Sequence, residues 1–407
     1  MRIPQFTIAV AIVAMIGPAA TPDALTADPI VVTCPAEPPE IRSFALAESW
    51  RIDGDDDTAP LLGLVGDAVV DRTTGEILLL DRQLCRLLVF DAHGGLVGTL
   101  GREGEGPGEF RQPRALQLLA DGRVAVRTGW PTELVMLARD GTPAGAWSPR
   151  TAMSIWKARP TAGGWIATGS RRDVERSDAT RYCALLSLAL FDAEGEVVRE
   201  YRGGRTEQIQ QPRTYDERQG YFAAANWDLT ADGRIVVAAA RDQYRLEYLD
   251  LDGEVVRVVE RTFDAYRRTE QDLAQMRDQH RLYINGVRQE MVFHHLPTDP
   301  VIQRLEARPD GTLAVFTCHA TRGLPDGVIT RYDLHDATGH LTAEVRIHGD
   351  CDLEYDRLVL LSDDRAVVLR NYRTASRTAY NMQEEGDPER PDPTFSVIVC
   401  DLIPLDD

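Results

Sequence analysis

The chain has 407 residues, and its 45 Lys and Arg against 64 Asp and Glu give a formal net charge of −19. This balance argues against nucleic acid and against anionic membrane surfaces as partners, because both are bound through clusters of basic residues. Hydrophobic residues make up 43% of the chain, which is enough to build a sizeable folded core and argues against a disordered protein.

The first element in chain order is an apolar segment that predicts a secretory signal peptide over residues 1–20. Arg2 precedes an apolar run at 8–16, and small residues follow at Gly17 and Ala19. The run is too short to cross a bilayer, and no later segment approaches the roughly 18 apolar residues that a membrane helix needs. We therefore expect an exported protein, periplasmic or extracellular, without a transmembrane segment.

Residues 21–41 form an N-terminal extension in this interpretation. It contains Cys34, the residue that a lipid anchor would use. Val32 and Thr33 stand before it, where a lipidated cysteine is preceded by a small residue, and Cys34 lies well beyond the apolar run. A lipid anchor at Cys34 is therefore not expected.

Two series of glycine turns recur along the rest of the chain. Turns of the first series, each followed by an aliphatic run, begin at Thr74, Asp121, Gly163, Asp232, Asp310 and Asp363. Turns of the second series, most of them Asp-x-x-Gly, begin at Phe90, Leu137, Phe191, Leu249 and His335. Glycine supplies the positive φ of a tight hairpin, so each repeat reads as four antiparallel strands, the content of one propeller blade. The predicted fold is all-β, a six-bladed β-propeller over residues 42–407 with a short helical insertion.

The last repeat lacks its outermost strand, because there are six first turns and only five second turns. We expect Ser43–Ile52 to supply this strand by pairing with Ser396–Leu402, so that no sheet edge is left open where the chain ends meet.

Six cysteines in an exported chain suggest disulfide bonds. Fifteen pairings are possible, and no C-x-x-C spacing occurs, which argues against a zinc knuckle or a thioredoxin-like pair. We predict Cys34–Cys400, near the expected meeting of the chain ends, and Cys318–Cys351, in adjoining repeats. The alternative of buried free thiols stays open.

The segment Gly101–Phe110, with Pro113 after it, is similar to the linker between blades of NHL-type repeats. A second matching segment, Leu296–Ile302, leads to the turn at Asp310. From about Trp50 to Leu402, the chain resembles the bacterial exported family of 6-bladed β-propeller proteins. The resemblance implies the fold but little about activity, since members of the family are mostly described without an assigned reaction.

Three segments depart from the β pattern. Residues from about 264 to 292 contain good helix formers and predict a helical insertion, which either lies over the blade rims or covers a ligand as a lid. Arg202–Gly220 and Gln383–Pro393 are expected to be loops.

No motif for catalysis, metal binding or a cofactor stands out. The run Gly104-x-Gly106-x-Gly108 lacks the Lys-Ser/Thr of a phosphate loop and leads into a strand. His294 and His295 are adjacent, which does not give the i, i+4 spacing of a metal site on a helix. No catalytic residue, metal ligand or cofactor is therefore predicted.

Inner strands of a propeller begin around its axis, so their first polar residues are the candidate ligand-binding residues. Besides Asp67, these are Arg114, Trp156, Lys157, Asn226, Gln303 and Arg304. Arginine offers bidentate donors, so an anionic or amide-rich ligand is expected, and a water-filled channel without a ligand is the alternative.

The predicted function is that of an exported, non-catalytic monomer that binds a protein, peptide or glycan ligand. The alternative is a metal-dependent hydrolase or lyase of the lactonase type, with its site at the propeller axis. An enzyme of that kind would bring three or more carboxylate or amide groups together at the axis.

Overall fold

The structure is a computed structural model that describes residues 28–54, 59–178, 180–209, 213–219, 221, 226–238, 240–279, 282–284, 287–289, 291–379 and 394–405. The predicted signal peptide at 1–20 and the predicted loop at 383–393 lie outside these residues. The described chain is mostly β, and its main sheets are built from strands that follow one another in sequence.

The first three sheets each contain four antiparallel strands. The first sheet comprises β3 (Val65–Val70), β4 (Ile77–Asp81), β5 (Arg86–Phe90) and β6 (Leu96–Leu100). The second comprises β7 (Ala115–Leu118), β8 (Val124–Arg127), β9 (Leu134–Leu137) and β10 (Pro143–Trp147). The third comprises β11 (Ser154–Thr161), β12 (Gly164–Arg172), β13 (Arg181–Asp192) and β14 (Val197–Ile209).

The fourth sheet adds β1 (Ile30–Cys34) to the edge of a four-stranded unit. That unit comprises β16 (Trp227–Leu229), β17 (Ile235–Val237), β18 (Tyr244–Leu249) and β19 (Val255–Arg261). Eight further strands form one sheet, in two runs that meet at β2 (Ile41–Asp53). One run is β23 (Ile302–Ala307), β24 (Leu313–Thr317), β25 (Val328–His335) and β26 (Leu341–His348), and the other is β27 (Arg357–Leu360), β28 (Arg365–Arg370) and β29 (Ser396–Pro404).

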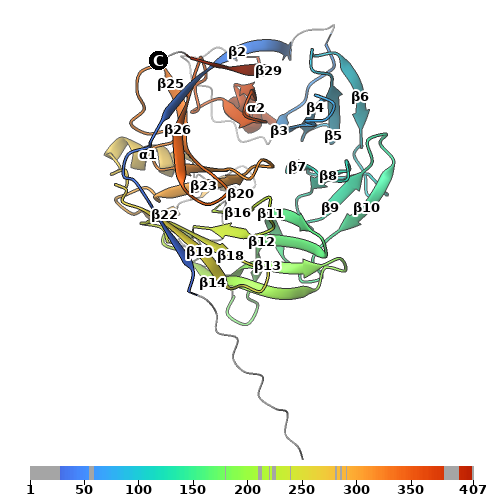
Figure 1. The fold of residues 1–407 in the computed structure, drawn as a ribbon. Helices are drawn as coiled ribbons and strands as arrows, with labels where there is room; N and C mark the ends of the chain where they lie inside the picture. The colour runs from blue at the N-terminus through green and yellow to red at the C-terminus, as the bar shows by residue number, and fades with distance from the viewer. Residues whose placement is uncertain are drawn as a thin grey trace, which may run out of the picture.

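These sheets lie around a common centre, with β3, β7, β11, β16 and β23 toward it and β2 on the outer rim (Figure 1). Apolar clusters fill the spaces between successive sheets; Leu80 and Val126, for example, belong to a cluster between the first and second sheets. The first sheet also packs against the last strands, since Ile77 and Leu79 share a cluster with Val367 and Val399. The arrangement is propeller-like.

The predicted pairing of the two chain ends is confirmed. Strand β2 runs antiparallel to β29, with Leu46 opposite Leu402 and Ile52 opposite Val397. Two pairings of the N-terminal segment were not predicted. Strand β1 runs parallel to β19, and residues 41–45 of β2 run parallel to β26. The segment at 30–53 therefore covers the outer edges of three successive groups of strands.

The hairpin turns are also confirmed, and they divide the molecule into two faces. All five glycines of the second turn series have φ between 84° and 89°, a range that favours glycine. The turns of both series join the first strand of a group to the second or the third to the fourth, so these turns share one face. The longer connections, at 173–180, 210–226, 262–301 and 371–395, leave the opposite ends of the strands. We call that side the long-connection face.

Two predictions about the departures from the β pattern need correction, and one helix was not predicted. In the described part of the insertion, the helix is confined to α1 (Glu270–Gln279), and β20 (Leu282–Ile284), β21 (Val287–Gln289) and β22 (Met291–His294) follow it. Strands β20 and β21 pair with each other, so strand pairing overrides the helix-forming composition of this part of the segment. The predicted loop at Arg202–Gly220 is partly wrong as well, because β14 continues to Ile209 and β15 (Arg213–Asp216) pairs with β22. Helix α2 (Tyr372–Ala379) was not predicted.

The two predicted disulfides are absent from the structure, in which all six cysteines are buried free thiols. Cys34 lies on β1, where its thiol donates to the Gly339 carbonyl, and Cys400 lies on β29, in a different group of strands. Cys400 instead shares a small apolar cluster with Cys351, and Cys318 accepts a hydrogen bond from the Tyr266 amide. Spacing along the sequence could not show which thiols meet.

Within the described part of the chain, neither helix is long and apolar enough to span a membrane.

Candidate functional site

Four arginines gather where the inner strands of the first, second and last sheets begin, at the centre of the long-connection face. They are Arg82, Arg114, Arg127 and Arg357, and we call them the arginine mouth. Arg114 and Arg357 are exposed, whereas Arg82 and Arg127 are half-buried. One carboxylate, that of Asp67 on β3, lies among them and accepts hydrogen bonds from the amides of Ala68 (3.1 Å) and Leu116 (2.9 Å).

Arg82 reaches the mouth by passing over Gly66 of β3, which has no side chain. A Cβ on Gly66 would lie 2.0 Å from the Arg82 Cδ atom, so only glycine leaves room for the arginine to cross β3. The guanidinium then donates to the Pro113 carbonyl at 3.2 Å and to the Tyr372 hydroxyl at 2.9 Å. The Arg357 guanidinium lies 5.5 Å from the centre of the same Tyr372 ring. Helix α2 therefore begins at the mouth and helps to position two of its arginines.

The charges at the mouth interact. Burial lowers the pKa of Arg127 to about 10; Asp67 opposes this shift, and the positive charges of Arg114 and Arg82 add to it. Burial raises the pKa of Asp67, while the Leu116 amide and Arg357 act in the opposite direction. Among the residues that the structure describes, like charges are thus held close together around the Asp67 carboxylate, whose own charged form is disfavoured by burial. Such a cluster attracts an anion.

A second group of charged residues binds the inner strands to one another. The Lys157 ammonium donates to the carbonyls of Trp227 (2.7 Å) and Leu305 (3.3 Å), which belong to two different inner strands. Asp228 is 1% exposed and lies 3.3 Å from the same ammonium. Its carboxylate also accepts from Arg159 at 2.7 Å and from the Ala307 amide at 3.1 Å. We call Lys157, Arg159 and Asp228 the axial belt.

Lys157 and Asp228 of the belt both have lowered pKa values, but for different reasons. Burial lowers the pKa of Lys157 to about 8, although Asp228 acts to raise it. Burial would raise the pKa of Asp228, but Arg159 and Lys157 hold it below its ordinary value. The free edges of inner strands carry unpaired amides and carbonyls, and the belt satisfies several of them. Its chemistry therefore suits cohesion of the fold.

The candidate residues predicted from the sequence do not form one cluster. Lys157 is bonded within the belt, and Arg114 lies at the mouth. Arg304 stacks on Phe316, with 3.7 Å between guanidinium carbon and ring centre. Trp156 is exposed, and Gln303 is half-buried. Asn226 is buried, and its Nδ2 donates to the Tyr221 carbonyl at 2.8 Å, while its Oδ1 has no partner in the described part of the chain.

Sequence reasoning missed Arg82, Arg127 and Arg357 at the mouth and Arg159 and Asp228 in the belt. The candidates came only from the starts of the first five inner strands, so Arg357, which begins the inner strand β27 of the last group, was left out. The second strand of each sheet runs antiparallel to the first, so its last residues reach the same face. A search that included the ends of second strands would have found Arg82 and Arg127.

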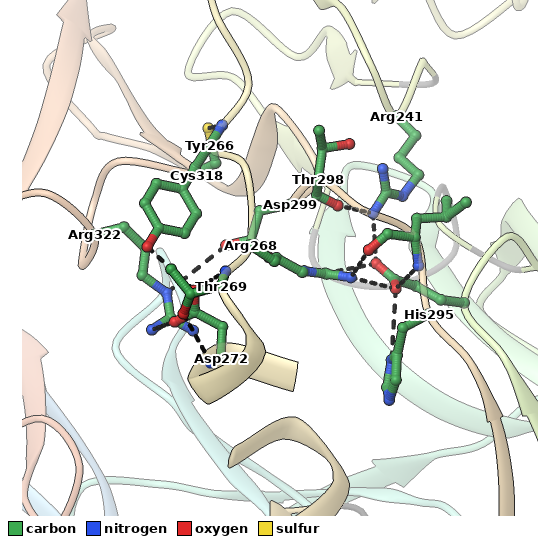
Figure 2. Close-up of polar contacts among 12 residues, drawn as sticks. Arg241, Tyr266, Arg268, Thr269, Asp272, His295, Thr298, Asp299, Cys318 and Arg322 are labelled. Atoms are coloured by element: carbon green, nitrogen blue, oxygen red, sulfur yellow. Dashed lines mark hydrogen bonds and ion pairs between the residues drawn. The ribbon is translucent and has the colours of Figure 1, made fainter. Parts of the chain in front are cut away.

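A buried network of ion pairs lies at the base of the insertion (Figure 2). Glu217 accepts from Arg241 at 2.5 Å and from Arg268 at 2.6 Å, and also from the Leu296 amide at 3.0 Å. Arg268 in turn donates to Asp299 at 2.5 Å. Both Glu217 and Arg268 have side chains less than a tenth exposed. These bonds join segments on both sides of α1 to the loops of the sheets.

The start of α1 belongs to the same network. Asp272 accepts from the Thr269 amide at 2.7 Å and from the Tyr266 hydroxyl at 3.1 Å, and it pairs with Arg322 at 2.6 Å. Figure 2 shows Arg322 and Arg268 on either side of the first turn of α1. A helix whose base is fixed by buried ion pairs fits the rim interpretation of the insertion better than that of a mobile lid.

Among the residues that the structure describes, no three His, Cys, Asp or Glu side chains form a group that could hold a metal ion.

Comparison with known proteins identifies no family. No family model matches the chain, and no curated protein matches it. A solved structure from Bacteroides fragilis NCTC 9343, named "Putative exported protein", is 12% identical, with 92% of this chain and 99% of that chain covered and a TM-score of 0.47. A member of the DUF4221 family from Bacteroides vulgatus is 8% identical, with coverage of 89% and 98% and a TM-score of 0.44. Virginiamycin B lyase from Staphylococcus aureus is 9% identical, with coverage of 88% and 100% and a TM-score of 0.40. These scores are all below 0.5, so they support no conclusion about family or activity.

Proposed function

We propose that the protein is an exported six-bladed β-propeller that binds an anionic ligand at its arginine mouth. The six blades are the first three sheets, the β16–β19 unit and the two runs of the eight-stranded sheet, with β2 as the outer strand of the last blade. The apolar clusters between successive groups of strands, including the cluster that joins the last group to the first, support this count.

The gathering of Arg82, Arg114, Arg127 and Arg357 carries the proposal. Arg82 and Arg114 both have partners within the chain, so the mouth is a positioned cluster of cations. Arginine presents planar, bidentate donors to carboxylates. A local excess of positive charge on a chain of net charge −19 needs a reason, and an anionic ligand supplies one. The ligand is then an acidic segment of a protein or peptide, or an acidic glycan.

Binding of two anionic polymers to the mature chain tests this proposal. Titration calorimetry with oligoglutamate and with oligogalacturonate of equal length distinguishes a peptide ligand from a glycan. Replacing the two exposed arginines, in an R114Q/R357Q variant, should weaken binding of the preferred polymer roughly tenfold or more, because charge-assisted hydrogen bonds are lost. Raising the salt concentration from about 0.05 to about 0.5 M should weaken binding as well.

The matched control is R234Q. Arg234 pairs with Asp232 in a tight turn on the opposite face, so the variant loses one positive charge away from the mouth, half of the charge that R114Q/R357Q loses. Unchanged affinity in R114Q/R357Q, or an equal loss in R234Q, would overturn the proposal. The melting temperature of each variant should stay close to that of the parent protein.

A further inference from the structure

The third sheet has a face that its neighbour does not fully cover. Strands β13 and β14 have 12 and 13 residues, whereas β9 and β10 of the second sheet have four and five. Ala189 and Phe191 of β13 pack against the second sheet, which identifies the side of β13 that faces it. A pocket of about 530 Å³ lies along this side. We call it the β13 groove.

The floor of the groove is a row of residues with almost no side chain. Ser187 on β13 and Gly203 on β14 lie opposite one another and line the groove, whereas Gly169 on β12, in the same row, lies against the Met153 side chain. The fold itself requires glycine at position 169, since a Cβ there would lie 2.0 Å from the Ser154 carbonyl oxygen. At Gly203 no backbone atom would lie closer than 3.9 Å to an added Cβ, and its φ is not in the left-handed region. Glycine within a strand often marks the close approach of another chain.

Charged residues lie at both ends of this floor. In the adjacent row, Arg171 and Arg205 lie on either side of Leu185. Arg205 pairs with Asp173 at 3.2 Å, and Arg171 has no hydrogen bond or ion pair with any described residue. At the other end, the Glu200 carboxylate reaches over Gly203, 2.2 Å from the place a Cβ would occupy. Rows two residues apart are separated by roughly 7 Å along a strand.

We propose that the β13 groove binds the C-terminal end of an extended peptide. The terminal carboxylate lies between Arg171 and Arg205, and the peptide backbone crosses the floor at Ser187 and Gly203. Apolar side chains of the peptide contact Leu185 and Val197, which is 47% exposed. Glu200 then faces an amide or a basic side chain further along the peptide. The Glu200 side chain turns away from Gly203 to admit the peptide, and the positive end, the floor and the negative end then follow the order of these groups in such a ligand.

Fluorescence polarisation with labelled Ala-Ala-Leu-Val tests the proposal. The peptide with a free C-terminus should bind at least about tenfold more tightly than its C-terminal amide, and R171Q should remove this difference. G203V should block binding by filling the floor. R172Q is the matched control for charge, because Arg172 is the next residue of β12 and points to the other side of the sheet.

G98V is the control for stability, since Gly98 lies in the outer strand β6 with no other atom within 4 Å of an added Cβ. If G203V does not fold, the comparison of R171Q with R172Q still tests the proposal. Equal affinity for the free and amidated peptides would overturn the proposal, as would an equal loss in R171Q and R172Q. Tighter binding of a fatty acid than of the free peptide would also overturn it. Polymer binding at the arginine mouth should be unchanged in all groove variants.

Discussion

At the scale of single residues, a charge pointing toward the axis does not by itself indicate a ligand. Lys157 was predicted to bind one, yet its ammonium is bonded to two inner-strand carbonyls and to Asp228. The sequence shows that a lysine stands at the start of a strand. It does not show whether a strand edge or a ligand supplies the partner, because both offer carbonyl oxygens. Arg114 was chosen for the same reason, its place at the start of an inner strand, and it lies at the arginine mouth.

Replacing Asp228 should show how strongly the axial belt stabilises the fold. D228N would leave the partly buried Lys157 and Arg159 without their shared carboxylate, which should cost less than the roughly 3–5 kcal/mol of a fully buried pair but more than about 1 kcal/mol. Urea unfolding followed by tryptophan fluorescence measures the free energy of unfolding. D252N is the control, since the Asp252 side chain is 84% exposed and its loss should change stability by less than about 0.5 kcal/mol. Equal stability of the two variants would contradict the role of the belt.

At the scale of elements, the turns were predictable and the insertions were not. A tight hairpin needs glycine at one position, so its signal is local, and the φ values confirm it. The extent of the insertion depends on long-range pairing. Strand β22 pairs with β15, far earlier in the chain, and nothing within the segment indicates that partner. Composition favoured helix over the whole segment, and tertiary pairing overrode it after Gln279.

The base of the insertion should loosen in acid. Burial opposes ionisation of Glu217, but Arg268, the Leu296 amide and Arg241 outweigh it and lower its pKa to about 2 from an ordinary 4.5. A depressed pKa means that Glu217 stabilises the fold above about pH 4.5 and that this contribution is lost as the pH falls toward 2. Hydrogen exchange of residues 268–279 should therefore rise in this range before that of the sheets.

The E217Q variant provides the comparison for this pH effect. Its insertion should exchange faster than that of the parent protein already at neutral pH, and its exchange should depend less on pH between about 4.5 and 2. E207Q removes a half-exposed carboxylate from the nearby strand β14 and should behave like the parent protein. If E217Q kept the exchange rates of the parent protein at every pH, the network would not be fixing the insertion.

At the scale of the whole molecule, the N-terminal segment joins distant parts of the chain. The turn count predicted that Ser43–Ile52 completes the last group of strands, and the pairing with β29 confirms it. The parallel pairing of β1 with β19 was not predicted, because the extension at 21–41 carries no turn signal and a parallel partner can lie anywhere in the chain. Exposed sheet edges promote association between chains, and this segment covers several of them.

Two N-terminal deletions should separate the roles of β1 and β2. Removing residues up to Cys34 would uncover only β19, so most of the protein should remain monomeric. Its melting temperature should fall, because the buried Val32 and Cys34 are lost from their apolar cluster. Removing residues up to Ile52 would also uncover β26 and β29, so this variant should aggregate at micromolar concentration. Light scattering coupled to size-exclusion chromatography measures both outcomes. A monomeric, folded chain after the longer deletion would show that β2 is dispensable, because the unpaired edge of β29 would then be tolerated in solution. If the shorter deletion were already enough to cause aggregation, β1 would be the strand that protects the sheet edges.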